Sequence, residues 1–164
     1  MPRRRSPAEL DLLLRELGTD LDLTFRGPAG YFEDADLTTV RAGDRSPRRT
    51  DLAIVAGLDS AEQLLANRLK TQVGELAPLG HPDYGSRHHE LIGQPNVERT
   101  RNLIKLYVLE ALGREPRVEK VLEATVYAPH DPPRDQVRIE LTLQLVGRPN
   151  PLNLVVPFSL GVGA

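Results

Sequence analysis

The sequence predicts an α+β fold in which central helices pack on a small antiparallel C-terminal sheet. Segments 59–74 and 97–113 repeat their apolar residues at the spacing of an amphipathic helix. Residues 136–147 alternate strictly between apolar and polar side chains, as a strand with one buried face does. The helices precede the main strands rather than alternating with them, which favours α+β over a parallel α/β sheet.

The first third of the chain is predicted to hold one helix and short strands. Residues 6–9 have the pattern of a capped helix start and Gly18 that of its stop. The apolar stripe of this helix is Leu10, Leu13, Leu14 and Leu17. So short a helix must dock its stripe on the domain or on a partner. Strands are expected at 20–25, 36–40 and 51–57, with an arginine-rich loop at 41–49.

Two helices are predicted in the middle of the chain. The first starts at Asp59 or Ser60 and stops at Gly74, with Ala61, Leu64, Leu65 and Leu69 as its apolar face. The second follows a cap at Asn96 and stops at Gly113. Its core face is predicted to be Val97, Thr100, Ile104, Tyr107, Val108, Ala111 and Leu112. Leu106 and Leu109 fall on the other side, so this helix is either central or covered by a second protein.

Three strands are predicted to follow, at 118–128, 136–147 and 152–160. The middle strand should point Val137, Ile139, Leu141, Leu143 and Leu145 inward. Pro157 has no N–H to donate to a ladder, so the last strand is predicted at the edge of the sheet.

The composition excludes several classes of function. The chain has 164 residues and a net charge of −2, which gives no field to attract nucleic acid or an anionic membrane. It has no cysteine, so disulfides, thiolate catalysis and cysteine-bound zinc are excluded. The apolar stretches are too short to span a membrane, and residues 7–17 are too charged for a signal core. We expect the protein to be cytoplasmic at synthesis and assembly, without direct membrane insertion.

The stretch from Gly80 to Gly93 holds three of the four histidines and resembles a metal or catalytic site at first sight. Its candidate zinc ligands are His81, Asp83, His88, His89 and Glu90. No H-E-x-x-H spacing occurs, and neighbouring histidines on a helix point about 100° apart. We interpret the histidines as turn and surface residues, and we predict no metal and no cofactor.

Hydrolase and nucleic-acid functions have little support in the sequence. Carboxylates are available at Glu75, Asp83, Glu90 and Glu98, but a sequence does not place a pair across a cleft. Ser86 near His88 or His89 lacks the context of a nucleophile elbow. The basic runs at 2–5 and 46–49 lack interleaved aromatic residues. We therefore predict a protein with no catalytic residues and no nucleic-acid partner.

One motif, Glu115-Pro116-Arg117, lies between the second central helix and the strand that follows it. Proline fixes the corner, so the carboxylate and the guanidinium are held apart in a defined geometry. Such a pair can bind a complementary pair on a partner. The alternative is an exposed ion pair of little energetic value, and the residues alone leave both open.

The order of these motifs resembles the baseplate wedge family of contractile phage tails, which is sometimes labelled lysozyme-like. The resemblance covers roughly residues 36–160 and is carried by the Pro82-x-Tyr84-Gly85-Ser86 turn, Leu91 and the Glu115-Pro116-Arg117 corner. The family includes baseplate subunits of type VI secretion systems and of phage-tail-like contractile injection particles. Residues 1–35 depart from it, so we expect an N-terminal extension there and a wedge-like α+β domain at 36–164.

The resemblance implies a structural role in a particle with several copies of the chain. Glu115, Pro116 and Arg117 would contact a bundle of helices from other wedge proteins. The last strand, with Leu152, Leu154, Val156 and Phe158, would bind the first ring of the sheath protein by strand addition. Two other functions stay open. One is a peptidoglycan hydrolase of a tail baseplate, and the other is a small regulatory binding module with this fold.

Overall fold

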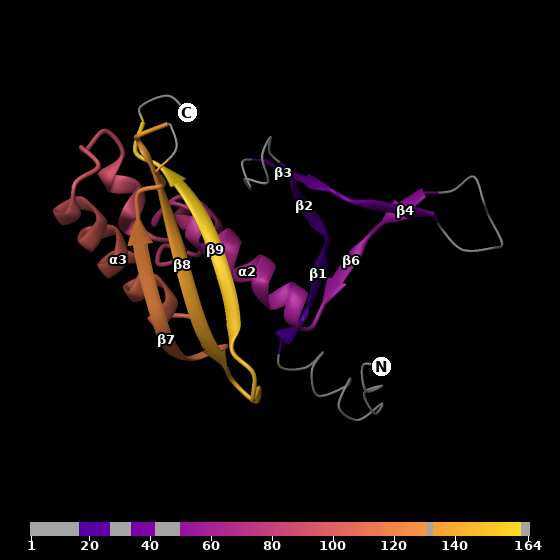
Figure 1. Cartoon of the computed structure of the whole chain (residues 1–164). Coiled ribbons are helices and arrows are strands. Elements are labelled where there is room, and N and C mark those ends of the chain that lie inside the picture. The colour runs from indigo at the N-terminus through magenta and orange to yellow at the C-terminus, as the bar shows by residue number, and fades with distance from the viewer. Residues whose placement is uncertain (1–16, 27–33, 42–49, 131–132, 162–164) are drawn as a thin grey trace. The chain divides into compact units, whose positions relative to one another are not determined.

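The computed structural model describes residues 17–26, 34–41, 50–130 and 133–161 (Figure 1). The chain divides into two compact units, Met1–Gln63 and Leu64–Ala164, so the predicted boundary after residue 35 lies inside the first unit. Most of the predicted N-terminal helix, the basic run at 2–5 and most of the arginine-rich loop lie outside the described residues. Leu17, the last residue of the predicted stripe, is buried. No helix in the described ranges is long and apolar enough to cross a membrane.

The described part of the first unit is built from short strands that pair as three antiparallel ribbons. These are β1 (Thr19–Leu21) with β6 (Ile54–Ala56), β2 (Leu23–Arg26) with β3 (Asp34–Leu37), and β4 (Thr39–Arg41) with β5 (Thr50–Leu52). Each of the three predicted strands is therefore real but is divided at one residue, namely Asp22, Thr38 or Ala53. At each of these residues the chain leaves one ribbon and enters the next.

The three dividing residues close a ring of backbone hydrogen bonds, which we call the three-ribbon junction. Asp22 N–H donates to the Ala53 carbonyl at 2.9 Å, and Ala53 N–H donates to the Thr38 carbonyl at 2.8 Å. Thr38 N–H completes the ring by donating to the Asp22 carbonyl at 3.0 Å. Figure 1 shows the ribbons diverging from this point. The ring satisfies backbone groups that would otherwise be unpaired where the ladders end.

Helix α2 (Leu58–Lys70) begins in the first unit and ends in the second. In the first unit, the Gln63 side chain accepts a hydrogen bond from Leu23 N–H at 2.9 Å and donates one to the Leu21 carbonyl at 2.8 Å. The helix stops four residues before the predicted Gly74. Beyond the helix, the Thr71 carbonyl accepts a hydrogen bond from Ser86 N–H at 2.9 Å, while Glu75 N–H donates to the Gln72 carbonyl, so the helical pattern does not continue.

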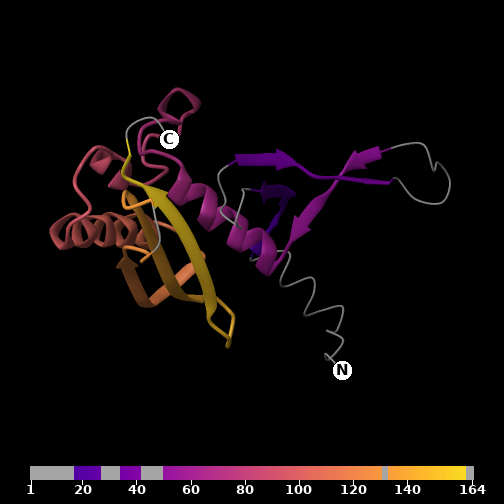
Figure 2. The ribbon, with the colours of Figure 1, turned by 45° about the horizontal axis from the view of Figure 1, so that its top comes forward.

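The second unit is a three-stranded antiparallel sheet with helices on one side. The order of the strands is β7 (Val118–Tyr127), β8 (Gln136–Leu145) and β9 (Leu152–Ser159). Helix α3 (Glu98–Gly113) contacts β7, and Figures 1 and 2 show the two helices on the same side of the sheet. The short 3-10 helices η2 (Ala77–Leu79) and η3 (Arg87–Leu91) lie between α2 and α3 in the chain. This arrangement confirms the predicted α+β class.

The core of the second unit follows the predicted periodicities. All five side chains predicted to face inward from β8 are buried, as are Leu154, Val156 and Phe158 of β9. The helices contribute Leu65, Leu69, Ile104, Val108 and Leu112. Each of these larger aliphatic side chains stabilises the fold by about 1.5–3 kcal/mol on full burial.

Two predictions at the start of α3 are wrong. Val97 precedes the helix as its N-cap residue and is exposed, so it does not join the core face. Asn96 does not cap the helix. Its side-chain amide donates to the carbonyls of Arg134 and Gln136 at 2.9 and 3.0 Å, and its side-chain oxygen accepts from Arg101 at 2.9 Å. Asn96 thus ties the helix start to the start of β8.

Candidate functional site

The turn motif at residues 82–86 is held by close backbone contact. Gly85 has a φ of 103°, a conformation that favours glycine. A Cβ atom at this position would lie 2.6 Å from the Thr71 carbonyl oxygen. Gln72 and Ser86 form an isolated bridge, and Val73 N–H donates to the Ser86 carbonyl at 3.3 Å. The turn is therefore attached to the end of α2, while Pro82 and Asp83 at its start are exposed.

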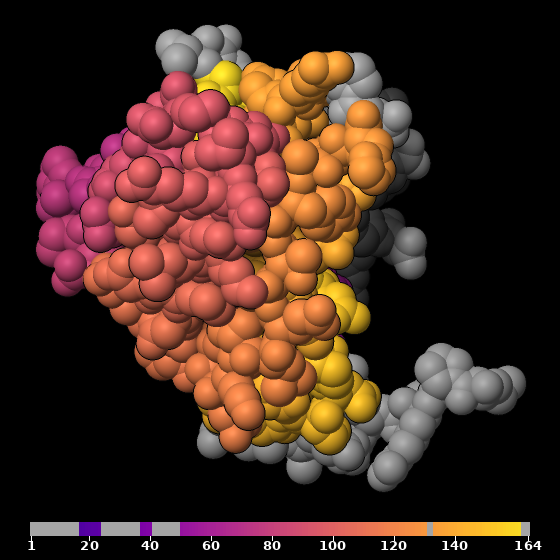
Figure 3. All heavy atoms as spheres, turned by 60° about the vertical axis from the view of Figure 1, so that its left-hand side comes forward, coloured from indigo at the N-terminus to yellow at the C-terminus, as the bar shows by residue number. Residues whose placement is uncertain are grey.

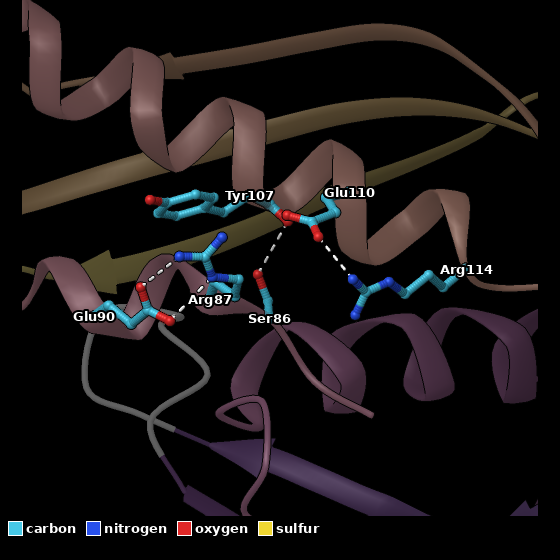
Figure 4. Close-up of polar contacts among 6 residues, drawn as sticks. All are labelled: Ser86, Arg87, Glu90, Tyr107, Glu110 and Arg114. Carbon is cyan, nitrogen blue, oxygen red and sulfur yellow. Dashed lines mark hydrogen bonds and ion pairs between the residues drawn. The ribbon is translucent and has the colours of Figure 1, made fainter. Parts of the chain in front are cut away.

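Ser86 and His88 form a buried polar chain beneath this turn. His88 is 1% exposed, and its Nδ1 lies 2.8 Å from Ser86 Oγ. Ser86 Oγ in turn donates to the Tyr107 carbonyl on α3 at 3.4 Å (Figure 4). When the hydroxyl hydrogen is directed to Tyr107, Ser86 Oγ can accept a hydrogen bond from the Nδ1–H tautomer of His88. The His88 ring also packs against the Phe158 ring in a T-shaped arrangement, with 4.5 Å between the ring centroids.

The interpretation of His88 as a surface residue is therefore wrong. His88 and Leu91 are the buried residues of η3, three positions apart as on one face of a 3-10 helix. The sequence alone does not distinguish His88 from its neighbour His89. Burial, with a smaller contribution from neighbouring His89, lowers the pKa of His88 to about 3. His89 is half-buried, and its Nε2 lies 2.9 Å from the Leu69 carbonyl.

Arg68 connects the two motifs that are distant in sequence, and sequence analysis did not identify it. Its guanidinium lies over the Tyr84 ring, with Cζ 4.5 Å from the ring centroid. Its Nη2 also donates to Glu115 Oε2 at 2.9 Å. The Arg68 side chain is 10% exposed and that of Glu115 is 6% exposed. We call Arg68, Tyr84 and Glu115 the Arg68 cluster.

The Arg68 cluster changes what the Glu115-Pro116-Arg117 corner presents to a partner. The Glu115 carboxylate is used inside the unit, by Arg68 and, at 3.4 Å, by the Arg117 backbone N–H. Pro116 is exposed, and Arg117 is half-buried. No hydrogen bond or ion pair to the Arg117 guanidinium occurs within the described ranges. The outward part of the corner is therefore Pro116 and Arg117, with Glu115 as their internal anchor.

The surface beside the corner is formed by α3 and η3. Arg87 lies over the Tyr107 ring, with Cζ 4.5 Å from the centroid, and donates two hydrogen bonds of 3.0 Å to Glu90 (Figure 4). Glu110 and Arg114 form a second exposed pair at 2.7 Å. Leu106 is 57% exposed, as predicted for the outer side of the helix. Figure 3 shows α3 as an open face next to β7.

The last strand of the sheet, β9, has an unpaired edge in the described structure, as predicted from Pro157. It pairs with β8 alone, and Pro157 lies opposite Arg138. A proline is tolerated within a strand where its missing N–H would point away from the ladder. By alternation, the backbone N–H groups of Asn153, Val155 and Ser159 point outward as well. The side chains of Leu154, Val156 and Phe158 face the core, and Leu152 is half-buried.

The carboxylates and histidines do not form a recognisable metal centre. In the part of the chain that the structure describes, no group of three or more His, Cys, Asp or Glu side chains is placed to bind a metal ion. Hydrogen bonding to Arg87 lowers the pKa of Glu90, which is the opposite of what a general acid requires. A shallow depression on the outer face of the sheet is lined by Glu123 and Glu140 among other residues.

Comparison with known proteins relates this chain to a solved structure. No protein-family model matches the chain, and no curated protein matches it. Among solved structures, it is similar to a "putative tail lysozyme" from Geobacter sulfurreducens, with a TM-score of 0.54 and 28% sequence identity. The match covers 63% of this chain and 90% of that chain. The similarity supports a relationship to phage-tail proteins.

Proposed function

We propose that this protein is a structural, non-enzymatic baseplate component of a contractile tail or injection particle. It would join the wedge to the first ring of the sheath and provide the strand on which sheath assembly starts. The open edge of β9 carries this proposal, because an unpaired strand edge is a template for strand addition. The similarity to a tail protein supports the same type of particle.

The two edges of the sheet differ in their suitability for strand addition. The pairing of β7 with β8 has register shifts between Val118 and Lys120 and between Val121 and Glu123. Such bulges twist an edge and interrupt its row of backbone groups. The register of β9 with β8 is continuous from Leu152 to Ser159. Because Pro157 removes one outward donor, we expect the added strand to bind at Asn153 and Val155.

The wedge contact in this proposal uses the corner and the outer face of α3. The helical bundle of the wedge would cover exposed Leu106 and contact Pro116 and Arg117. The Arg117 guanidinium, which has no hydrogen bond or ion pair to any described residue, is suited to a bidentate contact with a carboxylate of that bundle. Glu115 would act through Arg68, by fixing the position of the corner.

Replacing Val155 with proline tests the strand-addition proposal. The Val155 N–H points away from β8, so the variant should keep its core and its melting temperature to within a few degrees. It should fail to start the sheath, because an outward donor is lost and the proline ring blocks the incoming strand. The measurement is the fraction of sheathed particles in electron micrographs, together with thermal unfolding of the purified chain.

Two control variants make the Val155 result specific. Asn153→Ala removes a side chain from the solvent-exposed face of the sheet but keeps the backbone N–H that points away from β8. This variant should assemble normally. Val156→Pro removes an inward N–H and should unfold at a much lower temperature. Full sheath assembly by a folded Val155→Pro variant would rule out addition at this edge.

The name of the similar protein makes a peptidoglycan hydrolase the second candidate. The carboxyl groups to test for it are those of Glu123 and Glu140, which both line the depression on the sheet. Glu140 accepts a hydrogen bond from Tyr127 at 2.5 Å. Release of fragments from purified cell wall, lost in Glu123→Gln or Glu140→Gln and retained in Asp83→Asn, would favour this function over the structural one.

A further inference from the structure

The outer face of the C-terminal sheet is the face turned away from α2 and α3 (Figure 1). Residues that pair across strands share a face, so their side chains form rows that run across β7, β8 and β9. Two neighbouring rows of the outer face are Glu123 with Thr142 and Asn153, and Thr125 with Glu140 and Val155. Both rows line the shallow depression of about 310 Å³, which therefore extends to the edge strand at Val155.

Every charged residue that lines this depression is acidic, namely Glu123 and Glu140. The cations of the three strands are Lys120 and Arg138, and their pairing places them on the same face in the rows on either side. Neither of them lines the depression. Along the strands, the charges of the outer face therefore follow the order cation, acid, acid, cation.

The Glu140 carboxylate is held in a fixed orientation. It is half-buried, and its Oε1 accepts a hydrogen bond from the Tyr127 hydroxyl at 2.5 Å. Its second oxygen, Oε2, has no hydrogen bond or ion pair to any residue that the structure describes. One oxygen is thus used to orient the group, and the other can accept a charged hydrogen bond from a partner.

A strand that pairs with the free edge of β9 places one side chain beside Val155 on the outer face. Neighbouring strands lie about 4.8 Å apart, so the backbone of this residue is about 10 Å from that of Glu140. The aliphatic stem of a lysine or arginine can lie across Val155, which is 42% exposed, and bring its charge to the Glu140 carboxylate. A short side chain does not cover this span, and an acidic one meets two like charges.

We propose that the strand added to β9 carries a lysine or arginine opposite Val155, and that Glu140 and Glu123 recognise it. This inference rests on the proposed function, because it concerns the strand that β9 accepts. Backbone hydrogen bonds are the same for any sequence, so this charge would select the partner. It would also fix the register, because a shift of two residues toward Pro157 brings the partner's cation next to Arg138.

Reversing the charge of the depression tests this contact in assembled particles. Glu140→Lys should lower the fraction of sheathed particles in electron micrographs at least about tenfold, because two cations would then face each other. Glu123→Lys should lower the fraction in the same direction. Glu123 is exposed, and this variant keeps the Tyr127–Glu140 hydrogen bond, so its thermal unfolding should match that of the native chain. A loss of sheathing in Glu123→Lys therefore does not reflect misfolding.

The matched control is Glu119→Lys, which makes the same change of charge at an exposed bulge of β7 outside the depression. This variant should sheathe as the native chain does, and an equal loss in it would overturn the inference.

The Val155→Pro variant separates this inference from the proposed function. If it abolishes sheathing while folded Glu140→Lys and Glu123→Lys variants sheathe normally, strand addition stands and the cationic partner residue is wrong. If Val155→Pro leaves sheathing intact, strand addition at β9 fails and this inference fails with it.

Discussion

Gly85 is the residue on which the turn motif depends most directly. Its positive φ and the Thr71 carbonyl at 2.6 Å from its absent Cβ both require glycine. The contact brings Ser86 into the core, where its hydroxyl orients His88. Tyr84, on the other side of Gly85, is half-buried against Arg68. A single backbone conformation thus directs two neighbouring side chains to two different partners.

We predict that Gly85→Ala destabilises the protein by about 2–4 kcal/mol. About 1 kcal/mol comes from the positive φ, and the remainder comes from displacing the backbone at Thr71 and Gln72. Gly80→Ala is the matched control, because Gly80 has a φ of 87° but no atom within 4 Å of the added Cβ. Urea unfolding of the two variants separates these costs. Equal losses would mean that the close contact contributes nothing.

At the scale of elements, the Arg68–Glu115 pair joins the end of α2 to the corner that follows α3. The pair is almost completely removed from water, and Arg68 Nε is buried without a hydrogen-bond partner. Removing the charges from solvent offsets much of their attraction, so the net contribution of such a pair is small. Loss of one partner is different, because it leaves the other charge buried alone.

We predict that Glu115→Ala destabilises the protein by about 3–5 kcal/mol, while Arg68→Met combined with Glu115→Leu costs much less than the sum of the single changes. Denaturant unfolding of the three variants closes the double-mutant cycle. Glu110→Ala, which breaks the exposed pair with Arg114, should cost below about 0.5 kcal/mol. Additive losses would show that the two side chains act separately. Arg117→Ala is consequently a cleaner test of the wedge contact than Glu115→Ala.

The sequence predicts the elements better than it predicts how they are joined. Strands β7 to β9 and helix α3 follow from period-2 and period-3.6 patterns, which are local and strong. Helical periodicity places Arg68 within the predicted apolar face of Ala61, Leu64, Leu65 and Leu69, but no local pattern indicates that Glu115 pairs with it. In the sequence, Asp22, Thr38 and Ala53 are indistinguishable from other strand residues. Their role in the ring appears only when the three segments meet in the fold. The partners of these residues are more than a dozen positions away, so periodicity carries no information about them.

For the whole molecule, the buried neutral His88 couples folding to pH. Its pKa is about 3 in the folded chain and near 6.5 when unfolded, so the unfolded chain binds the proton first as the pH falls. The stability that this residue contributes is complete above pH 6.5 and is lost progressively between pH 6.5 and pH 3. Net charge is close to zero over part of this range, so general charge repulsion adds little at mildly acidic pH.

We predict that His88 alone lowers the free energy of unfolding by about 2 kcal/mol between pH 7.5 and pH 5.0. The measurement is urea unfolding of the native chain and of His88→Gln at both pH values. The variant is expected to be less stable at each pH but to lose about 2 kcal/mol less on acidification. His81→Gln, at an exposed position, should keep the native pH dependence. The same slope in all three proteins would refute the assignment to His88.

The three-ribbon junction also has a consequence for how the first unit folds. Each hydrogen bond of its ring takes one group from each of two segments, and consecutive segments lie 16 and 15 residues apart along the chain. If any one of the three segments is absent, two of the three hydrogen bonds cannot form. The ring therefore has no stable partly formed state. The loop-closure entropy of both connections between the three segments must be lost before the ring is complete. The N-terminal unit should therefore form in one cooperative event, late relative to the local helices of the second unit.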